Sequence, residues 1–98
     1  MNIQTIYKES IQAARNIELR DEEMYQVDDI RSDGFILWVT EQYGLSVAIS
    51  DKGLGDEIRV VEVDSECYPS NDDTRTTDIE EVVELLERFA SERGEVAA

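Results

Sequence analysis

Hydrophobic residues repeat at three- and four-residue steps at both ends of this chain and at two-residue steps between them. The first spacing is typical of a helix with one apolar face, and the second of a strand with one buried face. At 98 residues, the chain is long enough for one modest core. The pattern therefore predicts a single α+β domain over residues 1–98, in the order α-β-β-β-β-α. We expect an antiparallel four-stranded meander with two helices packed on one face.

The two predicted helices span residues 3–17 and 77–94. In the second, "TDIE" matches a capping box with Thr77 as the cap and Glu80 reaching back to it, and Gly94 marks the expected end. The apolar stripe of the first helix consists of Ile3, Ile6, Tyr7, Ser10, Ile11, Ala14 and Ile17, and that of the second of Ile79, Val82, Val83, Leu86, Phe89 and Ala90.

The four predicted strands are residues 24–27, 35–40, 45–50 and 58–63. A three-residue loop, "QYG", with Gly44 in the left-handed conformation, is expected to join the second and third strands. The link "DKGLGDE" is expected to be a turn, and residues 64–76, which contain the only proline, a surface loop. The loop "QYG" would set Val39 opposite Val47 and Leu37 opposite Ile49, with Phe35, Leu37, Val39, Leu45, Val47 and Ile49 on the core face.

The opposite face of the predicted sheet carries more apolar side chains than a solvated face usually shows. Ile36, Trp38 and Ala48 would lie on it, together with an apolar pair from residues 58–63. Either the strand register differs from the one described above, or this face is a partner or dimer surface anchored by Trp38.

The net charge is −15, from 24 acidic and 9 basic residues. Residues 1–20 hold three bases and two acids, so the acidic surplus belongs to the rest of the chain. Such a surplus repels nucleic acids and anionic membranes and attracts basic surfaces. The longest apolar run, "FILWV", is far shorter than the roughly 20 residues of a membrane helix. The polar start and the single cysteine, Cys67, lead us to expect a cytoplasmic protein with no disulfide and no membrane contact.

The stretch "DDIRSDGFILWVTE" is the closest approach to a metal-binding motif. With Asp29 as the first position of a calcium loop, Asp33 and Gly34 fall correctly at the fifth and sixth. Arg31, however, occupies the third position, where an oxygen ligand is needed, and Thr40 the twelfth, where a glutamate is needed. The spacing therefore favours an acidic turn that leads into a strand, and we expect no metal site.

Catalytic side chains are scarce. The chain has no histidine, which removes the commonest general base and the usual metal ligand. Cys67 lies among acidic residues that disfavour a reactive thiolate. Pairs of carboxylates are expected by chance in so acidic a chain. We therefore expect no catalytic residue, no cofactor and no enzymatic activity.

The acidic residues are expected to gather at the ends of the sheet. In a meander, turns 28–33 and 51–57 fall at one end, where only Arg31 and Lys52 oppose the acids. The other end would collect Asp21, Glu22, Glu23, Asp64, Glu66, Asp72 and Asp73. The candidate partner-binding residues are Asp28, Asp29, Asp33, Asp51, Asp56, Glu57, Asp72 and Asp73, with Trp38 as an apolar anchor.

The density of charge is comparable to that of DNA. A compact chain of this length is roughly 33 Å across, and 15 phosphate charges occupy about 25 Å of duplex. In size, charge and small α/β make-up, the chain resembles the small acidic phage proteins that act against host defences, including anti-CRISPR and anti-restriction DNA mimics. The resemblance rests on no motif, so no family residue is carried over. It implies an inhibitor, active in the host cytoplasm, that binds the basic nucleic-acid-binding surface of a nuclease or CRISPR effector and does not bind nucleic acid itself.

Three other functions agree with the same composition. An immunity protein or antitoxin would neutralise a basic toxin, and an acidic chaperone would form a homodimer through the open sheet face. A halophile-adapted domain would carry its acids for solvation only, in keeping with seven arginines against two lysines. Thermal unfolding in low salt separates the last alternative, because a halophilic domain should unfold there.

Overall fold

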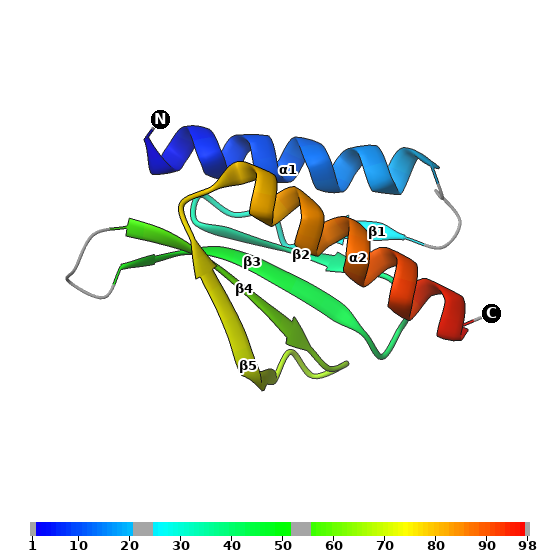
Figure 1. Ribbon diagram of the computed structural model, residues 1–98. Coiled ribbons are helices and arrows are strands. Elements are labelled where there is room, and N and C mark those ends of the chain that lie inside the picture. The colour runs from blue at the N-terminus through cyan, green and yellow to red at the C-terminus, as the bar shows by residue number, and fades with distance from the viewer. Residues whose placement is uncertain (1, 21–24, 52–55, 98) are drawn as a thin grey trace.

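A computed structural model describes residues 2–20, 25–51 and 56–97 (Figure 1). Five strands form one antiparallel sheet in the order β1-β2-β3-β4-β5, and α1 and α2 pack against each other on one of its faces. The elements are α1 (Ile3–Arg20), β1 (Gln26–Asp28), β2 (Gly34–Trp38), β3 (Gly44–Asp51), β4 (Asp56–Val63), β5 (Pro69–Thr76) and α2 (Ile79–Ala97). The α+β class and the meander with both helices on one face are confirmed, and the sheet has one strand more than predicted. Of the predicted turn 51–57, Asp51 ends β3 and Asp56 and Glu57 begin β4, while residues 52–55 and residue 24 lie outside the described residues.

The additional strand is β5, and the prediction of a surface loop over residues 64–76 is wrong for its second half. Thr76 pairs with Ile58 of β4 and is buried, although its neighbours are mostly polar. The only proline, Pro69, is the first residue of β5, which is a position that a strand tolerates. β5 is therefore an edge strand that owes its conformation to pairing with β4 and not to its own apolar content.

Both helices bury the predicted stripes, but the ends of α2 differ from the prediction. Asn2 caps α1 by accepting a hydrogen bond from the Thr5 amide at 2.9 Å. The cap of α2 is Asp78, whose carboxylate accepts the Glu80 amide at 3.0 Å, so the prediction of Thr77 as the cap is wrong. The predicted end at position 94 is also wrong, since α2 continues to residue 97.

The hairpin between β2 and β3 has a longer turn than predicted. Leu37 pairs with Leu45, so the predicted pairing of Leu37 with Ile49 is wrong, and so is that of Val39 with Val47. The turn spans residues 39–43, and the Val39 amide closes it by donating to the Tyr43 carbonyl at 3.0 Å. Leu37 thus pairs four residues earlier on β3 than predicted, and because this offset is even, every side chain keeps its predicted face.

Gly44 does not adopt the left-handed conformation that was predicted for it. It is the first residue of β3 and lies under the Trp38 ring, where an added Cβ would approach Cε3 to 2.8 Å and Cζ3 to 2.9 Å. Glycine is therefore required at this position for the close approach of an indole ring to the backbone.

The core lies between the helices and the covered face of the sheet. The Tyr7 ring of α1 packs against Phe35 with 5.9 Å between centroids, and its hydroxyl donates to the Arg31 carbonyl at 2.7 Å. Burial of Tyr7, reinforced by the nearby Asp33, raises the pKa of its phenol. The predicted core face of the sheet is confirmed, with Ile49 only partly buried; the buried members are Phe35, Leu37, Val39, Leu45 and Val47.

The face of the sheet away from the helices, here called the open face, has the predicted apolar character. Ile36, Trp38 and Ala48 point to it and are half-buried. Val61 and Val63 of β4 lie on the same face, because they pair with Ser46 and Gly44, and only 4% and 6% of their surface is exposed. The prediction that these side chains point away from the main core is confirmed.

Candidate functional site

Three of the candidate acidic residues lie where β1 leads into β2: Asp28 ends β1, Asp29 and Asp33 belong to the turn that follows, and all three are exposed. Asp29 has a φ of 52°, a left-handed conformation that aspartate tolerates better than most residues. The Arg31 amide donates to the Gly34 carbonyl at 2.8 Å, and the Asp33 carbonyl accepts the Ile49 amide at 2.7 Å. Backbone bonds thus hold this acidic turn against β3, and its carboxylates are not used to build it.

A second acidic group belongs to the hairpin of β3 and β4, at the same end of the sheet. Asp51 and Asp56 are opposite each other in the ladder, and Glu57 follows. The hairpin extends three residues past the pairing of Gly34 with Ala48, about 10 Å along the strand. The two groups are therefore at one end, as expected, but on separate projections. The expected neighbour Lys52 lies outside the described residues.

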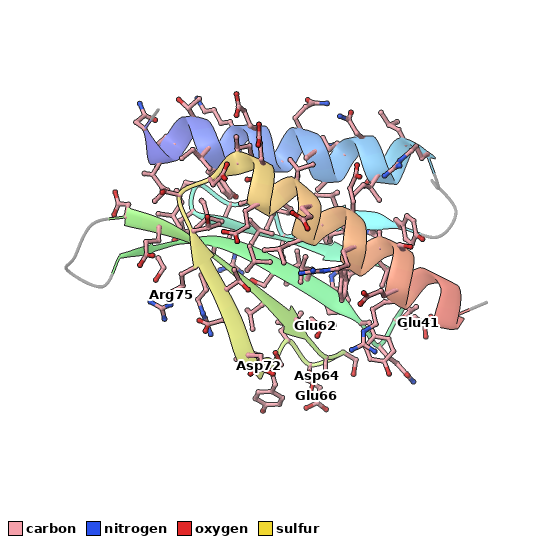
Figure 2. The ribbon with its side chains drawn as sticks, in the orientation of Figure 1. Glu41, Glu62, Asp64, Glu66, Asp72 and Arg75 are labelled. Atoms are coloured by element: carbon pink, nitrogen blue, oxygen red, sulfur yellow. The ribbon has the colours of Figure 1, made fainter. Side chains whose placement is uncertain are left out.

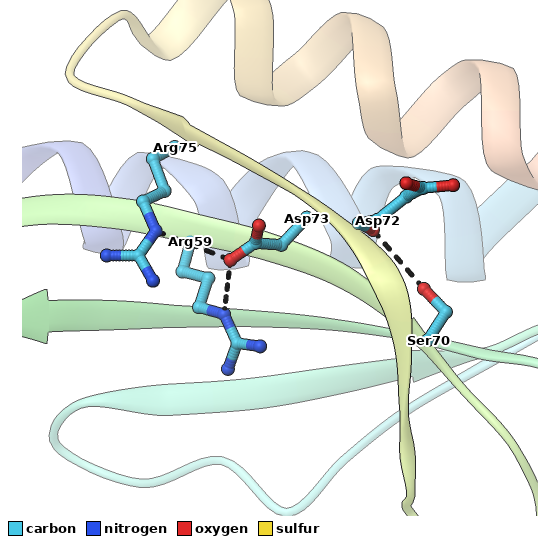
Figure 3. Close-up of polar contacts among 5 residues, drawn as sticks. All are labelled: Arg59, Ser70, Asp72, Asp73 and Arg75. Carbon is cyan, nitrogen blue, oxygen red and sulfur yellow. Dashed lines mark hydrogen bonds and ion pairs between the residues drawn. The ribbon is translucent and has the colours of Figure 1, made fainter.

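Asp72 and Asp73 lie inside β5 and not in a loop; Figure 2 shows Asp72 toward the end of the sheet that carries Asp64 and Glu66, and Asp73 pairs with Val61, two residues before the end of β4. Their side chains also lie in different surroundings. Asp72 lines a groove beside α2 together with Arg88, and its carbonyl accepts the Ser70 hydroxyl at 3.2 Å (Figures 2 and 3). The structure therefore does not bring this pair together with the acidic turn. The acids at positions 21–23 lie outside the described residues.

Asp73 is neutralised within the molecule. Its Oδ2 accepts the Nε of Arg59 at 2.7 Å and the Nε of Arg75 at 3.3 Å (Figure 3). The hydrogen bond from Arg59 is the main cause that holds the pKa of Asp73 below its usual value. Arg59 and Arg75 are directly opposite each other in the ladder, so the carboxylate separates two like charges. Among the candidate residues, Asp73 is thus suited to stabilising the sheet and poorly suited to a partner.

The loop between β4 and β5 carries Asp64 and Glu66 at the end of the sheet where they were predicted (Figure 2). The Asp64 carboxylate accepts the amides of Glu66 at 2.9 Å and Tyr68 at 3.0 Å, which folds the loop tightly. Cys67 in this loop is exposed and has a φ of 66°. Its side chain lies near the open face, where it lines a depression with Ile36 and residues of β3.

Trp38 is the candidate residue with the most defined surroundings. It lies on the open face at the wall of a cleft of about 510 Å³. Two carboxylates, Asp28 and Glu41, line the same cleft. Glu41 belongs to the β2–β3 turn and was not among the predicted site residues. Its position in "WVTEQYG", three residues after Trp38 and three before Gly44, is a signal that could have pointed to it.

An arginine site of related composition is already present on the helix-covered side. Arg93 of α2 donates Nε to Glu62 at 3.0 Å, and its guanidinium carbon is 4.9 Å from the centre of the Tyr43 ring. The hydrogen bond that Arg93 donates to Glu62 raises the pKa of Arg93 above its ordinary value. An aromatic ring and a carboxylate therefore hold one arginine within this protein.

The chemistry that these side chains support is recognition of positive charge. Within residues 2–20, 25–51 and 56–97, no group of three or more acidic or cysteine side chains is arranged to hold a metal ion. In the same part of the chain, no helix is long and apolar enough to cross a membrane. The fold and surface together define an acidic two-layer α+β domain with one sheet face that the helices do not cover. Comparisons with protein-family models, curated proteins and solved structures find no match.

Proposed function

We propose that this protein is an acidic inhibitor that binds the basic nucleic-acid-binding surface of a nuclease or CRISPR effector and blocks access of DNA or RNA. The proposal rests on one observation: most carboxylates of the described residues have no Lys or Arg partner in an ion pair. The chain has 24 acidic residues, and among the described residues only Glu62, Asp73 and Glu87 take part in ion pairs. A surface of this kind retains a strong negative potential for a basic partner.

The distribution of acids along α2 supports the proposal. Glu80, Glu84 and Glu87 follow at four- and three-residue steps on the exposed side of the helix. Each such like-charge pair costs about 0.2–0.5 kcal/mol of helix stability. Among the described residues, the one ion pair of this row joins Glu87 to Arg20 at 3.7 Å, and both side chains are more than half exposed. An acidic row with so little compensation is useful to a protein that presents negative charge to a partner.

The dimensions allow a comparison with duplex DNA. The molecule measures 40 × 26 × 21 Å. Spread over the long axis, the net charge of −15 amounts to about one charge per 2.7 Å, against about one per 1.7 Å for the duplex. The density is lower than that of DNA but of the same order. A basic cleft that attracts DNA by charge would therefore attract this protein as well.

The test is capture of the partner followed by competition. The immobilised protein is incubated with lysate of cells that carry the target system, and bound proteins are eluted with duplex DNA at constant ionic strength. A basic nucleic-acid-binding protein that DNA elutes supports the proposal. Charge reversal of Asp29, Asp33 and Asp56 to lysine should abolish the capture. Capture that survives these reversals, or direct binding of oligonucleotides by the protein, contradicts the proposal.

A second function, an acidic homodimeric chaperone, is favoured by one observation: the apolar open face with the half-buried Trp38. Such a dimer would bury Trp38 between two copies. Sedimentation equilibrium separates the two functions, because the inhibitor requires no dimer. Thermal unfolding in low salt separates both from halophilic adaptation, since only a halophilic domain should unfold without molar salt.

A further inference from the structure

The cleft at Trp38 has the composition of a site for an organic cation. Its lining residues come from three segments of the chain, 26–28, 38–41 and residue 65. They are Gln26 and Asp28 of β1, Trp38 of β2, Thr40 and Glu41 of the β2–β3 turn, and Ser65 of the β4–β5 loop. Of the described residues that line the cleft, none is a lysine or an arginine. An indole ring thus shares a cleft with two carboxylates and no internal cation.

The backbone positions the three segments that carry the recognition groups. Trp38 is fixed by its close approach to Gly44, whose missing Cβ leaves room for the ring. The Thr40 hydroxyl accepts the amides of Gln42 and Tyr43, both at 3.0 Å, and this turn positions the adjacent Glu41. Asp28 is paired with Ile36 in the ladder, and its side chain is therefore directed to the same face as the indole. The backbone that carries these side chains is thus fixed by the sheet and the turn, so binding a ligand would cost little backbone entropy.

The occupant can be inferred from the arginine that the protein already binds internally. Arg93 is held by a ring, Tyr43, and a carboxylate, Glu62, at 4.9 Å from the ring centre and 3.0 Å from the carboxylate oxygen. The open-face cleft repeats the ring and the carboxylates but lacks the arginine. A guanidinium stacks on an aromatic face and donates to carboxylates at once, which an ammonium does less well.

From this arrangement we infer that the cleft between Trp38, Asp28 and Glu41 binds an arginine side chain of the basic partner. The kind of partner rests on the proposed function, whereas the existence of the cation site does not. The indole would stack on the guanidinium and the two carboxylates would accept its N–H groups. The site would thus add a specific anchor to an attraction that is otherwise set by net charge.

The test uses a capped tetra-arginine peptide as the probe, with emission of Trp38 as the readout. Because the chain has one tryptophan, a change in emission reports this cleft alone. We expect saturable binding with a change in emission, and weaker binding of a tetra-lysine peptide. The double variant Asp28→Asn/Glu41→Gln should bind tetra-arginine about tenfold more weakly. The charge-matched variant Glu9→Gln/Glu81→Gln, whose substitutions lie on the exposed sides of α1 and α2, should lose less than about threefold.

Trp38→Leu supplies an independent readout by calorimetry, with circular dichroism to verify that the variant is folded. It should bind tetra-arginine about fivefold more weakly. Equal losses of tetra-arginine affinity in the two double variants would contradict binding at the cleft. The proposed inhibitor would then still stand, as a protein that binds its partner by net charge. Equal affinity for the tetra-lysine and tetra-arginine peptides would contradict stacking of a guanidinium on the indole. A dimer in sedimentation that buries Trp38 would overturn the inference as well, because the second copy would then occupy the cleft.

Discussion

Gly44→Ala tests the packing that places Trp38 on the open face. The new Cβ would lie 2.8 Å from Cε3 and 2.9 Å from Cζ3 of the indole, whereas carbon atoms prefer about 3.5–4.0 Å. The ring must therefore move by roughly 0.6–1 Å, since it is rigid and the strand backbone lies beneath it. Overpacking of this kind lowers the free energy of unfolding by about 1–3 kcal/mol, and the reduced entropy of the unfolded chain offsets about 0.4–1 kcal/mol of this loss. We expect a net loss of about 0.5–2 kcal/mol.

Urea unfolding followed by Trp38 emission measures both parts of this prediction. The midpoint should fall, the slope should stay unchanged, and the emission of the folded state should shift because the indole has moved. Gly34→Ala is the matched control on the neighbouring strand. The added Cβ would lie 3.2 Å from the Ala48 methyl, and a shift of a few tenths of an ångström relieves this contact. The urea midpoint of Gly34→Ala should therefore stay closer to that of the parent protein. A Gly44→Ala variant with the parent midpoint and the parent emission would refute the reasoning.

Three further predictions concern the core, a helix cap and an ion pair. Leu86→Ala, at a fully buried position, should lower the free energy of unfolding by about 2–5 kcal/mol in urea, whereas Leu19→Ala, at a side chain that is 70% exposed, should change it by less than about 0.5 kcal/mol. Asp78→Ala should cost about 1 kcal/mol by loss of the α2 cap, and Thr77→Ala should cost almost nothing; the opposite order would restore Thr77 as the cap. Asp73→Asn should destabilise the protein at neutral pH. Since the folded pKa of Asp73 is lowered, its contribution is present above the ordinary carboxyl pKa of about 3.9 and is lost as pH falls through the lowered value. The difference in melting temperature between parent and Asp73→Asn should therefore shrink at acid pH, and a constant difference would contradict the pairing.

The fold could be predicted from the sequence wherever hydrophobic periodicity carried the information. Both helical stripes and the core face of β2 and β3 are confirmed because burial on one face leaves a period that can be read directly. β5 could not be predicted in this way. Its residues are mostly polar, and pairing with β4 overrides their weak preference for a strand.

Details that depend on tertiary contacts were also out of reach. Thr77 and Asp78 both fit a cap, and only the hydrogen bond to the Glu80 amide decides between them. Gly44 fitted a turn equally well, and its contact with Trp38 is visible only when the register is known. The sequence shows which segments carry the acidic residues. It does not show that Asp73 pairs with two arginines or that Glu41 lines the same cleft as Trp38, because both depend on the folded chain.

The most direct test of the account is displacement of nucleic acid from the captured partner. Anisotropy of a labelled duplex bound to that partner is recorded while the acidic protein is added at several salt concentrations. We predict release of the duplex at a one-to-one ratio of the two proteins, and inhibition that weakens steadily as salt rises. A duplex that stays bound to a partner already saturated with the acidic protein would contradict the claim that its carboxylates take the place of phosphates.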